Sequence, residues 1–84
     1  MRPFRFMAGP GRPNSRAELV EHARRAEALG YDALVIPDHL LQQFAPLPAL
    51  AAVAGATTRL RVGTFVLNND LRHPAVVAQE LATL

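Results

Sequence analysis

Along the chain, short apolar runs typical of strands take turns with longer segments whose apolar residues recur at helical spacing. This pattern predicts three strands and three helices. Short runs rich in apolar side chains have the length and composition of strands, and the longer segments between them repeat apolar residues at helical spacing. The predicted strands are residues 4–8, 31–36 and 60–67, and the predicted helices are residues 16–29, 47–56 and 75–84.

Boundary residues agree with this division. Ser15 stands three residues before Glu18, the spacing of a capping box at the start of a helix. Gly30 is placed to end that helix in a left-handed conformation. Pro37 has no N–H to give to a sheet ladder and predicts the end of the second strand, and Pro74 predicts the first turn of the last helix.

Regular alternation of strand and helix predicts an α/β fold, in which parallel strands are joined by right-handed crossovers. The apolar half of residues 31–36 suits a strand buried on both faces. Alternation alone is compatible with both an open doubly wound sheet and a barrel. The first predicted strand-to-helix turn, residues 9–13, contains two prolines and lacks the three spaced glycines of a dinucleotide-binding fingerprint.

Length and composition narrow the functional classes. A complete β/α barrel needs roughly 250 residues, so 84 residues supply about a third of one or a small domain of another kind. All nine basic residues are arginines spread along the chain, and the net charge is only +2, so we expect no nucleic-acid partner. The chain has no cysteine and no apolar run long enough to span a membrane, and we expect a cytoplasmic protein.

Candidate chemistry follows two neighbouring strands. Asp38 and His39 come directly after the second strand, and a polar segment that includes Asn68 follows the third. Ligands bind at the carboxyl ends of parallel strands, so these segments could face one pocket. Imidazole exchanges protons near neutral pH, which suits His39 to general acid-base work. The alternative is that Asp38 and His39 only cap backbone amides, and that Asn68 only forms a turn.

Other polar residues carry less weight. His22 lies among charged residues of the first helix, where we expect an exposed side chain without a function. His73 precedes Pro74 and is expected mainly to mark the entry to the last helix. No spacing of His, Asp and Glu matches a known metal pattern, so we predict no metal site.

Several motifs occur together in order. The chain contains A-x-x-A-E-x-L-G-Y-D over residues 23–32, then Asp38-His39, then T-x-R-x-x-V-G-T over residues 57–64, and finally a helix that begins with His-Pro. In this combination the sequence resembles the N-terminal part of the luciferase-like monooxygenase family. It is most similar to the branch of oxidoreductases that use the deazaflavin coenzyme F420.

The resemblance implies the first three β-α units of a (β/α)8 barrel, with residues 1–84 as one incomplete domain. It implies FMN or coenzyme F420 at the barrel mouth and hydride transfer to or from, or oxygenation of, a small organic substrate. His39 matches the candidate proton-transfer residue, and Asp38 matches the acidic residue beside the cofactor ring. Asn68 matches a cofactor hydrogen-bonding position. Val66 matches a bulge that supports the ring, with a cis peptide bond expected at Phe65-Val66.

The resemblance stops before the family's phosphate-binding loops and later catalytic residues. We therefore expect the 84 residues alone to bind cofactor poorly and to show no turnover, and we expect their exposed sheet edges to favour association. The resemblance implies a homodimer for a full-length protein. The competing hypothesis is a non-catalytic fragment or a small interaction module without enzymatic activity.

Overall fold

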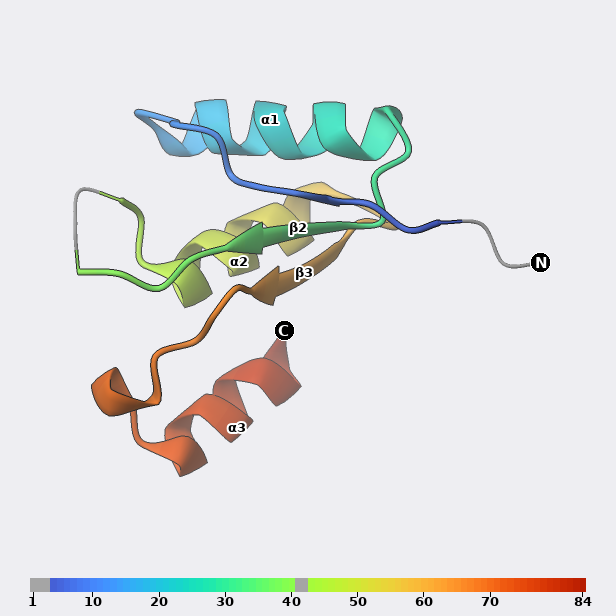
Figure 1. The fold of residues 1–84 in the computed structure, drawn as a ribbon. Helices are drawn as coiled ribbons and strands as arrows, with labels where there is room; N and C mark the ends of the chain where they lie inside the picture. Colours follow the sequence, from blue (N-terminus) through green and yellow to red (C-terminus); the bar gives the residue numbers. More distant parts are fainter. Residues whose placement is uncertain (1–3, 41–42) are drawn as a thin grey trace.

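The computed structural model describes residues 4–40 and 43–84 and confirms the α/β class. The sheet is parallel with strand order β1-β2-β3, and Figure 1 shows the helices α1, α2 and α3 beside it. Its elements are β1 (Met7–Ala8), α1 (Arg16–Ala28), β2 (Ala33–Ile36), α2 (Pro46–Ala56), β3 (Arg61–Thr64), the short 3-10 helix η1 (Asn69–Leu71) and α3 (Pro74–Thr83).

One face of the sheet carries the core. Leu34 and Ile36 of β2 are buried, whereas Ala33 and Val35, which alternate with them, are only partly buried. The expectation that the second strand, β2, is buried on both faces is therefore wrong for this chain, because α1 and α2 pack against one face of the strands. The core cluster comprises Leu19, Ala23, Leu34, Ile36, Leu47, Ala49, Leu50, Val53 and Leu60.

The predicted boundaries of α1 are confirmed in detail. The Ser15 hydroxyl accepts a hydrogen bond from the Glu18 N–H at 3.1 Å, and the Glu18 carboxylate accepts the Asn14 N–H at 2.8 Å. At the other end Gly30 has a φ of 89°, and its N–H donates to the carbonyl of Glu27. Donors and acceptors at both ends of the helix are thus satisfied by neighbouring residues.

The strands are shorter than the sequence predicts, for reasons that the hydrogen bonds show. The Phe6 N–H donates to the side-chain carboxylate of Asp32 at 2.9 Å instead of a strand carbonyl, so β1 begins only at Met7. At the other end the last pair of the ladder between β2 and β3 is Ile36 with Thr64, and the Phe65 N–H donates to the Ile36 carbonyl. Pro37, which follows β2, has no N–H with which to extend the strand.

The third helix is less enclosed than the first two. No residue of α3 is buried, although the structure describes all ten of them. Pro74 occupies the first turn, as predicted, and the preceding His73 accepts the Ala75 N–H through Nδ1 at 3.1 Å. Within the described residues, no helix has both the length and the apolar character needed to cross a membrane.

Candidate functional site

The segments that follow β2 and β3 meet beyond the carboxyl ends of the two strands. Both segments leave the sheet on the same side in Figure 1. Residues that are 30 positions apart in sequence then make direct contact, because the Asn68 N–H donates to Oδ2 of Asp38 at 2.7 Å. The parallel strands thus bring together two of the residues that the sequence singled out.

Asp38 is the most enclosed polar residue of this group, with only 3% of its surface exposed. Its Oδ2 accepts a hydrogen bond from the half-buried guanidinium of Arg72 as well as from the Asn68 N–H. Arg72 first, and the Asn68 N–H second, lower the pKa of the Asp38 carboxyl below its ordinary value, and they outweigh the effect of burial, which raises it. Asp38 is therefore held as a carboxylate.

The other candidate residues are exposed. His39 follows Asp38 and presents its imidazole to solvent, and the Val66 side chain is 70% exposed. The peptide bond between Phe65 and Val66 is cis, as the family resemblance implied. Exposed aromatic, aliphatic and imidazole groups thus follow the ends of two adjacent strands.

Asn68 also stabilises the local turn. Its side-chain oxygen accepts the Asp70 N–H at 3.0 Å and caps η1. The interpretation of Asn68 as a turn former is therefore confirmed, and its backbone N–H makes a separate contact with Asp38.

Two histidines have structural contacts. His73 caps α3, which confirms the interpretation of this residue as the entry to the last helix. The expectation of an exposed His22 is wrong: its side chain is half-buried, and Nε2 lies 2.8 Å from the carbonyl oxygen of Gly9. The ring also lies against Gly11, which has a φ of 70°. His22 therefore helps to hold the segment between β1 and α1.

Sequence reasoning missed Arg72 and Glu27. The contact of Arg72 with Asp38 joins residues 34 positions apart, and no local sequence pattern predicts it. Glu27 looked like an ordinary polar residue of a helix, but its Oε2 accepts the N–H groups of Thr58, Arg59 and Leu60 at 3.0, 2.6 and 2.7 Å. These bonds tie the end of α1 to the segment that enters β3.

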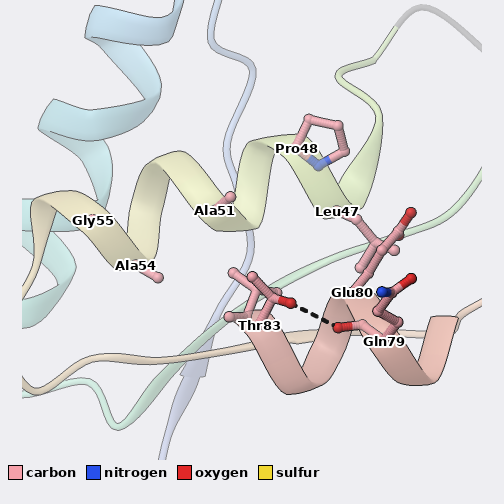
Figure 2. A pocket seen from close by; sticks show the side chains of 9 residues that line it. Leu47, Pro48, Ala51, Ala54, Gly55, Gln79, Glu80 and Thr83 are labelled. Carbon is pink, nitrogen blue, oxygen red and sulfur yellow. Dashed lines mark hydrogen bonds between the residues drawn. The ribbon is translucent and has the colours of Figure 1, made fainter. Parts of the chain in front are cut away.

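A cavity of about 690 Å³ lies between α2 and α3, away from the candidate residues. Figure 2 shows Leu47, Gln79 and Thr83 along it, with the Thr83 hydroxyl donating to the Gln79 carbonyl at 2.9 Å. The α2 side is built from alanine, glycine, leucine and proline and offers no group for acid-base chemistry. Within residues 4–40 and 43–84, no three His, Asp or Glu side chains gather in a way that could hold a metal ion.

Comparison with known proteins gives a consistent result. The family model described as luciferase-like monooxygenase matches residues 1–84. An F420-dependent glucose-6-phosphate dehydrogenase of Kribbella flavida is 44% identical over 75 residues, which cover 80% of this chain and 22% of that protein. The proteins of the same name from Amycolatopsis mediterranei and Mycobacterium avium are 43% and 44% identical, with the same coverage. The chain thus spans about a fifth of the length of these curated relatives.

Proposed function

The chain belongs to the luciferase-like monooxygenase family, and we propose that it forms the first three β-α units of a (β/α)8 barrel oxidoreductase that uses coenzyme F420 or FMN. The observation that carries this proposal is the meeting of the two strand-end segments, where the Asn68 N–H reaches Asp38. In barrel enzymes the reacting groups sit at this end of the sheet, on the loops after the strands.

The character of the residues at this end suits a flat, partly polar ring system. Phe65 and Val66 are 64% and 70% exposed and offer apolar surface, while Asn68 and Asp38 supply polar groups beside it. We propose that Val66 supports the cofactor ring and that Asn68 and Asp38 border it. A bound flavin or deazaflavin supplies the capacity to accept or deliver a hydride.

His39 is the proposed acid-base residue. Its side chain is exposed, so a substrate can reach it, and it directly follows Asp38 in the sequence. The Asp38 carboxyl beside it, whose pKa is lowered chiefly by Arg72 and least by His39, stays ionised and places a negative charge next to the imidazole in sequence. His39 would therefore take or return the proton of a substrate hydroxyl as the substrate carbon is oxidised or reduced.

The relatives guide the choice of cofactor and substrate. They are named as F420-dependent glucose-6-phosphate dehydrogenases, so coenzyme F420 is the first cofactor and glucose 6-phosphate the first substrate to test. We propose a small organic substrate and a homodimer for the complete protein.

The proposal is tested by producing the complete protein from its gene and titrating it with coenzyme F420 and with FMN. We expect saturable binding of one of them, and much weaker binding by residues 1–84 alone. A folded complete protein that binds neither cofactor contradicts the proposed function and favours a non-catalytic module. Tight binding by residues 1–84 alone contradicts the view that they are an incomplete site.

A further inference from the structure

Residues 66–73, which we call the β3 exit segment, have few hydrogen bonds to the residues that precede them. Among the described residues, all of these hydrogen bonds end on one atom, Oδ2 of Asp38, in the segment after β2. They come from the Asn68 N–H and from the guanidinium of Arg72. The remaining hydrogen bonds of the segment stay within it or lead into α3.

We propose that Arg72 is a positioning residue that, through Asp38, holds the β3 exit segment against the end of β2. This inference rests on the proposed function, because that segment carries Val66 and Asn68, and Asp38 directly precedes His39. The pair would fix the distance between the proposed acid-base residue and the groups proposed to border the cofactor.

The physical reason lies in the burial of Asp38. A carboxylate with 3% exposure has lost most of its water and needs charged or N–H partners. Arg72 is its ion-pair partner among the described residues. Without that guanidinium the buried charge keeps one N–H donor, and the cheapest relief is for the segment or Asp38 to move until water reaches the carboxylate.

Arg72 contacts Asp38 through a single nitrogen, Nη1. A lysine ammonium can replace a monodentate contact of this kind, whereas a neutral glutamine leaves the charge uncompensated. Lysine at position 72 keeps the positive charge and glutamine removes it, so the two variants test whether the contact needs that charge.

The first measurement needs no cofactor. Hydrogen exchange of the complete protein is compared between wild type, Arg72→Gln and the matched control Arg25→Gln, which removes an exposed surface arginine paired with Glu21 at 3.7 Å. We expect faster exchange across residues 66–73 in Arg72→Gln, and wild-type exchange there in the control. Unchanged exchange in Arg72→Gln overturns the proposal, whatever the cofactor results show.

The second measurement is the Kd for whichever of coenzyme F420 or FMN the wild type binds. We expect Arg72→Gln to raise the Kd about 10- to 100-fold, because small displacements of positioning groups have effects of that order. We expect Arg72→Lys to stay within about threefold of wild type, since it keeps the charge. A wild-type Kd in folded Arg72→Gln overturns the positioning role.

The double variant Asp38→Asn with Arg72→Gln separates the positioning of the β3 exit segment from the stability of the protein. It replaces Arg72→Gln in the test if that single variant does not fold. It leaves no buried uncompensated charge, so we expect its Tm to recover while hydrogen exchange across residues 66–73 stays faster than in wild type. Exchange that recovers together with the Tm assigns the pair to stability alone and overturns the proposal. Loss of binding by the wild type itself contradicts the proposed function, and hydrogen exchange then decides the role of Arg72 independently.

Discussion

Two carboxylates, Glu27 and Asp38, hold the chain at opposite ends of β3, and they differ in what they bind. At the amino end of β3, Glu27 accepts three successive backbone N–H groups, those of Thr58, Arg59 and Leu60. At the carboxyl end, Asp38 accepts one backbone N–H and one guanidinium. Both contacts connect segments about 30 residues apart, but only the second involves a side-chain charge as a partner.

The causes of the two lowered pKa values express this difference. The N–H groups of Arg59 and Leu60 are the main reason why the pKa of Glu27 lies below its ordinary value, and for Asp38 the main reason is Arg72. Glu27 binds mainly backbone N–H groups, with the Thr58 hydroxyl 3.4 Å from its Oε1, and a carboxylate held in this way depends little on which side chains surround it. A carboxylate that binds a guanidinium fixes one particular side chain, which suits a region where geometry matters for chemistry.

The largest expected effect is on turnover and concerns the carboxyl end alone. His39→Gln should lower kcat of the complete protein about 10²- to 10⁴-fold, the usual contribution of a general acid-base group. The Tm should stay near wild type, because the His39 side chain is exposed. Steady-state kinetics and thermal melts measure both. The matched control is His22→Gln on α1, and equal losses in the two variants would refute the role of His39.

At the amino end the expected effect is on stability. Glu27→Gln keeps an oxygen acceptor but loses the charge that strengthens three hydrogen bonds, and it should lower the Tm by about 3–8 °C. Cofactor affinity should not change. The control is Glu21→Gln, which removes an exposed carboxylate of the same helix. A cofactor Kd that shifts with Glu27→Gln would show that the two ends are not separable.

The pH dependence of stability should follow both carboxylates. Their pKa values are lowered in the folded protein, so their stabilisation is complete above the ordinary values of 4.5 for Glu27 and 3.8 for Asp38. It should be lost as the pH falls through the lowered values, because the unfolded chain then binds more protons. Denaturant melts from pH 7 downward measure this. Glu27→Gln should show a shallower decline, and an identical decline would exclude Glu27 as a source.

The smallest expected effect comes from a local contact. Ser15→Ala removes the hydroxyl that accepts the Glu18 N–H and should destabilise the protein by about 1 kcal/mol. Chemical denaturation gives this value, and Ser15→Asp should restore it. A loss as large as that of Glu27→Gln would mean that local capping contributes as much as the contact between distant segments.

The fold was largely predictable because its signals are local. The cap at Ser15, the left-handed Gly30, the stop at Pro37 and the first turn at Pro74 all appear in the structure where the sequence indicated them. Strand lengths were less predictable. The start of β1 depends on a carboxylate at Asp32 that takes the Phe6 N–H, a contact across 26 residues.

The candidate site was predictable only in part. The order of strands placed Asp38 and Asn68 at one end of the sheet, since parallel strands end at the same edge. Nothing in the spacing indicated that Asp38 is buried or that Arg72 is its partner. A charged residue looks the same in a sequence whether its partner is nearby or absent.

The sequence by itself thus determined the α/β class, the ends of the helices and the sheet edge at which the candidate residues gather. The helix ends depend on backbone and side-chain groups within about four residues of one another. The class and the sheet edge follow from the order of strands and helices along the chain, because parallel strands end at the same edge. Only the tertiary structure decided which carboxylates are held, by Arg72 at one end and by backbone N–H groups at the other. The physical reason is that burial and pairing between distant residues exist only after the strands have been brought side by side.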